Sequence, residues 1–104
     1  MEIIEITNPT EQNLAVNYGE RQIVLELRWN DLLNYWFLNV KENIKGEWVY
    51  LGLGMTMSLN SNLFFDKWNL GKLYLIDVEQ GQTTEPIKKE DLGTRLALAR
   101  VWGE

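Results

Sequence analysis

The chain has 104 residues, enough for one domain, and 45% of them are hydrophobic, which is an ordinary proportion for a globular protein. It contains no cysteine and no histidine, which excludes disulfides, thiolate metal sites and nucleophile–histidine catalysis. A net charge of −5 opposes binding to phosphate backbones, so we expect no specific nucleic-acid partner.

The first residues, 1–6, have neither the basic region nor the long apolar region of a signal peptide. Apolar runs elsewhere stay well below the ~20 residues that a membrane-spanning helix needs. We therefore expect no membrane partner. We also expect no cofactor. The absence of cysteine suits the cytoplasm or an assembled particle better than secretion.

The first half of the chain consists of short alternating runs that are separated by turn residues, which is typical of antiparallel strands. Ile23, Leu25 and Leu27 share one face of the clearest run. Trp29 and Trp36 are expected to meet across the next hairpin. The strands predicted in this half cover residues 2–6, 12–18, 21–29, 35–43 and 47–55.

The last of these runs is apolar on both sides, with Val49, Leu51 and Leu53 on one side and Trp48 and Tyr50 on the other. This pattern predicts a strand that is covered on both faces or that crosses between two sheets.

The second half begins with a break in the alternation. Ser58 is a reasonable helix N-cap, and we expect one or two helical turns that pack on the core through Leu63, Phe64 and Trp68. A strand over 72–79, a polar loop over 80–90, a turn at 91–93 and a closing strand over 94–102 follow.

These elements predict a single all-β domain over residues 1–104. It is mainly antiparallel, a compact sandwich or barrel-like sheet of about seven strands with one short helix.

Carboxylates are the remaining groups for acid–base chemistry. Glu26 and Glu42 could form a glycosidase-like pair if the fold brought them into one cleft. A metal site would need converging oxygen ligands, for which the candidates are Asp77, Glu79, Glu90 and Asp91. We interpret Glu26 and Glu42 as solvated positions on strand faces, and we expect no catalytic residue, no metal site and no enzyme activity.

Aromatic residues are concentrated in three successive runs, and an exposed group of them could stack on sugars or bases. Core and rim packing is the alternative. The residues concerned are Trp29, Tyr35, Trp36, Phe37, Trp48 and Tyr50. A nucleic-acid surface is less favoured, because Arg28, Lys41 and Lys45 alone make a thin basic patch.

Leu32 and Leu33 occupy a hairpin tip, where polar turn residues are usual. Either they fold back over an open end of the sheet or they form a contact for another protein. Near the end of the chain, Arg95 could pair with Asp91 or face a partner, and Gly93 permits a tight turn between them.

Two stretches carry a resemblance to a known family. The hairpin from Leu25 to Asp31 with Trp36 to Val40, and the closing turn and strand from Glu90 to Leu96, resemble those of the phage baseplate plug family. Leu53-Gly54-Met55 and the run from Leu63 to Leu75 keep the family's order and spacing. The similarity spans nearly the whole chain.

The resemblance implies a structural subunit of the virion at the centre of a contractile tail baseplate, assembled in the host cytoplasm. It would contact hub, spike and neighbouring tail proteins and close the tail tube, as a homo-oligomer that could be a trimer. The alternative function is a carbohydrate-binding β-module. The chain departs from the family pattern at the Leu32-Leu33 tip and in the longer loop over 80–90. Candidate partner-contact residues are Leu32, Leu33, Trp48, Arg95 and Trp102.

Overall fold

The computed structural model describes residues 2–4, 6, 11–59, 62–78 and 87–101. Within these ranges the chain forms seven strands in two antiparallel sheets. It divides into two compact units, one formed by Glu11–Thr56 and the other by the chain before and after that segment.

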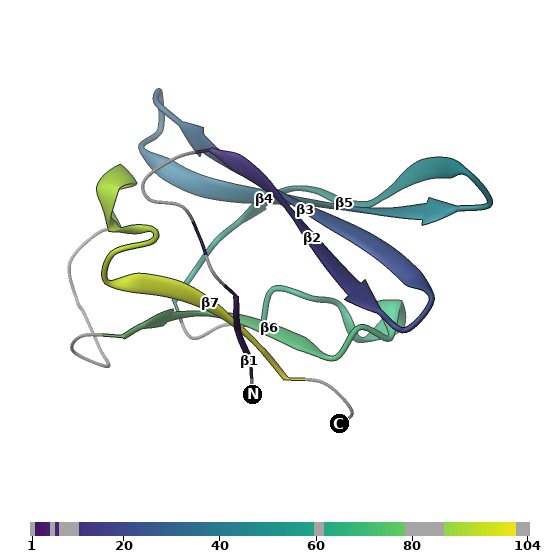
Figure 1. Ribbon diagram of the computed structural model, residues 1–104. Helices are drawn as coiled ribbons and strands as arrows, with labels where there is room; N and C mark the ends of the chain where they lie inside the picture. The colour runs from purple at the N-terminus through teal and green to yellow at the C-terminus, as the bar shows by residue number, and fades with distance from the viewer. Residues whose placement is uncertain (1, 5, 7–10, 60–61, 79–86, 102–104) are drawn as a thin grey trace. The chain divides into compact units, whose positions relative to one another are not determined.

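The Glu11–Thr56 unit is a four-stranded sheet in which each strand pairs with the next along the chain (Figure 1). Short hairpin connections explain this order, because strands that are adjacent in sequence pair with the least loss of chain entropy. The strands are β2 (Gln12–Tyr18), β3 (Arg21–Asn30), β4 (Tyr35–Ile44) and β5 (Glu47–Thr56).

One face of this sheet is apolar. In the register between β3 and β4, Leu25 lies opposite Val40 and Leu27 lies opposite Leu38, and all four side chains are fully buried. Trp29 lies opposite Trp36 as the sequence predicts, with the ring centroids 5.7 Å apart in an edge-to-face arrangement. We call this the apolar face; its other buried members are Val16, Tyr18 and Ile23.

The second unit contains a three-stranded sheet in the order β1 (Glu2–Ile4), β7 (Leu96–Val101) and β6 (Lys72–Asp77). Leu75 lies opposite Leu98 in the central register, and both are fully buried. Two short 3₁₀ turns, η1 (Asp66–Trp68) and η2 (Lys89–Asp91), complete the described elements.

The helix predicted from Ser58 is wrong in position and type. Leu59 instead forms a parallel bridge with Leu75, and Asn62 forms an antiparallel bridge with Tyr74, so both residues lie beside β6. Pairing with the edge of β6 satisfies backbone groups that an isolated helical turn would leave exposed. The predicted burial of Leu63, Phe64 and Trp68 is confirmed.

The all-β, mainly antiparallel class and the count of about seven strands are confirmed. The described strands form two open sheets, so neither closes into the barrel-like alternative. No helix in the described ranges is long and apolar enough to cross a bilayer.

Candidate protein-interaction surface

The second face of the four-stranded sheet carries the polar side chains. Glu26 lies opposite Asn39, whereas Glu42 lies opposite Ile23. Because the register between β3 and β4 is continuous and side chains alternate along a strand, Glu26 projects from the polar face and Glu42 from the apolar face. The two carboxylates therefore share no cleft, and the glycosidase-like pair is wrong for these residues.

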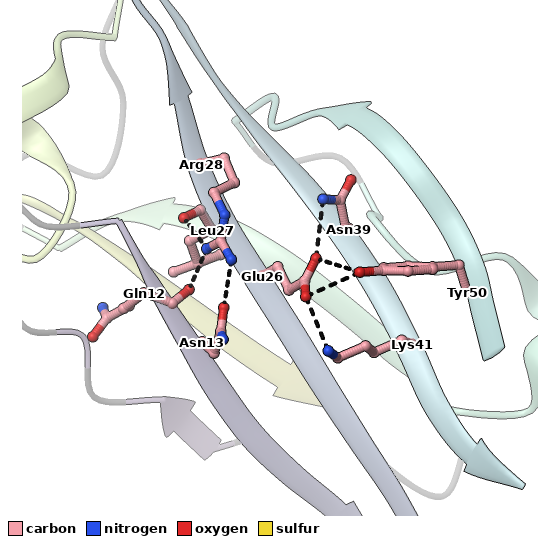
Figure 2. A network of polar contacts seen from close by, with 8 residues as sticks. All are labelled: Gln12, Asn13, Glu26, Leu27, Arg28, Asn39, Lys41 and Tyr50. Atoms are coloured by element: carbon pink, nitrogen blue, oxygen red, sulfur yellow. Dashed lines mark hydrogen bonds and ion pairs between the residues drawn. The ribbon is translucent and has the colours of Figure 1, made fainter. Parts of the chain in front are cut away.

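Glu26 is the centre of a network on the polar face (Figure 2). Asn39 Nδ2 donates to its carboxylate at 3.2 Å, the hydroxyl of Tyr50 donates at 3.1 and 3.2 Å, and Lys41 Nζ lies 3.1 Å away. Burial opposes ionisation of this carboxyl, but the donors outweigh burial and hold the pKa of Glu26 below its ordinary value. The network thus joins β3, β4 and β5 through one buried charge.

Glu42 is held separately by a two-pronged contact with Arg21, whose Nε and Nη2 donate at 2.7 and 2.8 Å. These hydrogen bonds are the main cause that lowers the pKa of Glu42, and they raise the pKa of Arg21. Glu26 and Glu42 are buried, at 7% and 8% exposed, so the interpretation of both as solvated strand-face positions is wrong. Each is instead a structural anion paired with its own cation.

Two of the three cations in the thin basic patch are also engaged within the sheet. Arg28 donates to Asn13 Oδ1 at 2.8 Å and to the carbonyl of Gln12 at 3.2 Å, and Lys41 is paired with Glu26 (Figure 2). Cations that are already paired contribute less to binding phosphates. This arrangement disfavours the nucleic-acid interpretation.

Strand β5 is exposed on both sides, contrary to the prediction that it is covered or crosses between sheets. Trp48, Val49 and Tyr50 have 46%, 43% and 45% of their surface exposed. The strand lies at the edge of its sheet and pairs with β4 alone. Its double-sided apolar pattern therefore reflects an unoccupied surface rather than a buried strand.

The regular part of β5 is short because its register shifts twice. Irregularities occur on either side of the Val40–Gly52 pair. Gly54 has a φ of +64°, a conformation that glycine adopts without strain, and its N–H donates to Asn39 Oδ1 at 2.7 Å. Asn39 thus links the Glu26 network to the bulged end of the strand. Leu53, beside Gly54, is 66% exposed.

The aromatic cluster predicted from the sequence is divided between the two faces. Trp36 is buried on the apolar face, and Trp29 lies opposite it. Trp48 and Tyr50 project from the polar face, since they pair with Asn43 and Lys41. Lys41 Nζ lies 5.3 Å from the Trp48 ring centroid and 5.8 Å from that of Tyr50. The exposed rings of Trp48 and Tyr50 therefore already make cation–π contacts with the Lys41 ammonium group.

The tip between β3 and β4 displays two leucines. Leu32 is 87% exposed and Leu33 is 65% exposed, so the interpretation in which they fold back over the sheet is wrong. Asn30 Oδ1 accepts hydrogen bonds from both of their backbone N–H groups, at 3.0 and 2.9 Å. Asn34, with a φ of +56°, donates from its N–H to the Asn30 carbonyl. The tip is thus a formed turn that presents apolar side chains outward.

Arg95 is engaged within its own unit. Its guanidinium donates to Asp91 at 2.9 Å and to Asp77 at 3.2 Å, so the predicted local pairing with Asp91 is confirmed. The Arg95 hydrogen bond is the main cause that lowers the pKa of Asp91. The described residues contain no group of three or more acidic side chains placed to hold a metal ion, and Glu79, one proposed ligand, lies outside the described ranges.

A comparison with protein families matches residues 1–102 to the family described as Cyanophage baseplate Pam3 plug gp18. The chain belongs to this baseplate plug family. The resemblance drawn from the hairpin and from the closing turn and strand is confirmed. A search of curated proteins found no match.

Membership in the baseplate plug family indicates a structural component of the phage tail baseplate, with other baseplate and tail proteins as its neighbours. It points away from an enzyme. Of the five candidate contact residues, the structure leaves Leu32, Leu33 and Trp48 exposed and engages Arg95 internally, while Trp102 lies outside the described ranges.

The prediction of a covered strand over 47–55 is wrong for Val49 and Leu53, which are surface residues of this baseplate plug chain. Their run is apolar on both sides, and a covered strand has the same pattern. The adjacent glycines at 52 and 54 were the available signal, since glycines within a strand often mark a bulge at a sheet edge.

Proposed function

We propose that this chain closes the central hub or tube of a contractile-tail baseplate through protein contacts made by the exposed apolar groups of its four-stranded sheet. It is incorporated during assembly in the host cytoplasm and works by shape and burial. The observation that carries the proposal is the tip at Leu32 and Leu33, which displays two leucines on a turn fixed by Asn30.

A fixed turn favours binding because less conformational freedom is lost when a partner docks. Burying exposed apolar surface contributes roughly 25 cal/mol per Å², so two leucines that enter a partner's apolar pocket stabilise the complex appreciably. The net charge of −5 supports the same role, since an acidic body beside the DNA path does not retain the genome.

Co-expression with the hub protein of the same phage tests this proposal. We expect the chain to co-purify with the hub, and the double change Leu32→Ser with Leu33→Ser to abolish that association. Val78→Ser is the control, because Val78 is also exposed, at 53%, but lies in the other unit. Normal hub binding by the leucine variant would contradict the assigned contact, and a wild-type chain that ignores the hub would contradict the function.

The carbohydrate-binding alternative rests on Trp48 and Tyr50. These two exposed residues are two positions apart on β5, so their side chains project from the same face of the sheet. It requires ring faces that are free to stack on sugars, and Lys41 lies over both rings. Titration with glycans would change Trp fluorescence if this function were present, and Trp48→Ala would remove that change. The plug proposal expects no response.

We also propose that copies of the chain associate with one another in the baseplate. Measuring the mass of the purified chain by light scattering gives the number of copies, and three copies would support the trimer implied by the family resemblance.

A further inference from the structure

The two edges of the four-stranded sheet differ in character. On β2 the exposed side chains are Asn13, Ala15 and Asn17, which are small or polar. On β5 the exposed side chains include Trp48, Val49 and Tyr50. Edge strands that do not pair with another chain are typically short, charged, bulged or covered by other parts of the protein. The part of β5 that precedes its bulges has none of these protections except Glu47.

The turn that opens β5 determines which of its backbone groups are free. Lys45 and Gly46 both have positive φ, at 54° and 87°, as in a type I′ hairpin turn. Ile44 and Glu47 lie opposite each other on either side of this two-residue turn. Residues in this position exchange backbone hydrogen bonds, so they form a hydrogen-bonded pair of β4 and β5. Because the pattern alternates, Trp48 and Tyr50 direct their backbone N–H and C=O groups away from β4, toward the open edge.

The residues around Val49 are arranged symmetrically, with an aromatic residue on each side. In an antiparallel pairing of two β5 strands centred on Val49, Trp48 of each copy faces Tyr50 of the other. The outward backbone groups of these two positions then meet each other, and the two valines meet on the two-fold axis. We infer that β5 pairs in this register with β5 of a second copy of the chain.

Charge selects this register over its neighbours. Centring on Val49 places Glu47 opposite Leu51, whereas centring on Glu47 would place two carboxylates opposite each other, which is destabilising. Lys41, beside the paired aromatic rings, does not repel its counterpart strongly, because it is neutralised by Glu26 at 3.1 Å. The rings and charges of the two copies are therefore compatible at this edge.

The bulges limit the contact to the regular part of the strand, residues 47–50, and Leu51 already lies at the first register shift. They turn the remainder of β5 out of the pairing direction and so prevent open-ended addition of further strands. The four-stranded sheet of each copy has one β5 edge. In a two-fold contact this edge is paired in both copies, so it is not open to a third copy. The threefold arrangement implied by the family resemblance would need a different surface.

Introducing a single cysteine tests the register, since the chain contains none of its own. Valines that face each other as a non-hydrogen-bonded pair have Cα atoms ~4.5 Å apart, within the range that a disulfide bridges. Under mild oxidation we expect Val49→Cys to give roughly tenfold more cross-linked dimer than Val78→Cys. Val78 is a matched control, because it is a valine exposed to a similar extent, 53% against 43%, in the other unit.

A charge exchange provides a second test. We expect the wild-type chain to self-associate when it is measured by light scattering. Val49→Lys and Val49→Glu each place like charges on the two-fold axis, so each variant alone should lose this self-association. An equimolar mixture of the two variants should restore it. Circular dichroism checks that each variant is folded.

Equal cross-linking at positions 49 and 78, or self-association that both charged variants retain, would overturn the β5 pairing. Closed trimers without cross-linking at position 49 would also overturn it. These measurements use the purified chain alone, so they are independent of hub binding. A chain that binds the hub but does not self-pair through β5 refutes this inference and leaves the proposed closure of the hub or tube intact.

Discussion

The hydroxyl of Tyr50 on β5 donates to both carboxylate oxygens of Glu26 on β3, at 3.1 and 3.2 Å, across the intervening strand β4. This contact ties the exposed edge strand to an interior strand of the sheet. An edge that presents its aromatic rings to a partner is thereby held in place before the partner arrives.

Tyr50→Phe removes this tie while keeping the ring. We expect the free energy of unfolding to fall by about 1 kcal/mol, because Glu26 loses one of its donors but keeps Lys41 and Asn39. Urea unfolding followed by Trp fluorescence measures the change. Tyr35→Phe, which deletes the same group from a ring packed beside Phe37, should have a smaller effect; equal losses in the two variants would contradict the assigned contact.

Stability should depend on pH through Glu26, Glu42 and Asp91. Their pKa values are lowered in the folded chain, so the unfolded chain binds protons more readily. Their contribution is complete above the ordinary glutamate value of 4.5 and is lost as the pH falls through the folded values. Thermal melts between about pH 7 and 3 measure this loss. Glu26→Gln should flatten the curve, and an unchanged slope would show that Glu26 contributes little.

The leucine tip should contribute almost nothing to folding stability. Leu32 and Leu33 are exposed, so Leu32→Ser with Leu33→Ser should change the free energy of unfolding by less than ~0.5 kcal/mol. Leu25→Ala is the contrasting variant, because Leu25 is fully buried and its truncation should cost about 2–5 kcal/mol. A large loss of stability in the serine variant would show that the tip packs against the sheet in solution.

Arg95 should matter more for stability than an exposed arginine does. Asp77 has a side chain that is 1% exposed, and Nη1 of Arg95 lies 3.2 Å from its carboxylate. Arg95→Ala should destabilise the chain by about 2 kcal/mol, less than the ~3–5 kcal/mol typical of a fully buried pair, because the Arg95 side chain is 19% exposed. Chemical unfolding tests this. Asp77→Asn combined with Arg95→Ala should lose less than the sum of the single changes if the two residues interact.

The β4–β5 hairpin can be strengthened at its turn. Lys45 has a φ of +54°, which is unfavourable for a lysine, and Asn is preferred at this position of a type I′ turn before glycine. Lys45→Asn should stabilise the chain by ~0.5–1 kcal/mol. An increased urea midpoint with an unchanged slope would confirm it, whereas a decrease would mean that the lysine side chain makes a contact that matters more than its backbone strain.

The sequence by itself determined the strands and their pairing within the Glu11–Thr56 unit, together with the family. Alternation at Ile23, Leu25 and Leu27 is a local property that depends on chain geometry, and hairpin partners lie next to each other in sequence. Pairing of Trp29 with Trp36 follows from that register.

The tertiary structure decided which apolar residues are covered. An apolar run looks the same whether it is buried or reserved for a partner, so Val49 and Leu53 could be placed only once β5 was seen at an edge. In the same way, Leu59 and Asn62 form bridges with Leu75 and Tyr74 at the open edge of β6, whose backbone groups competed successfully with a local helix. Burial and edge pairing are long-range properties, because they depend on which strands lie beside a segment rather than on the segment's own residues.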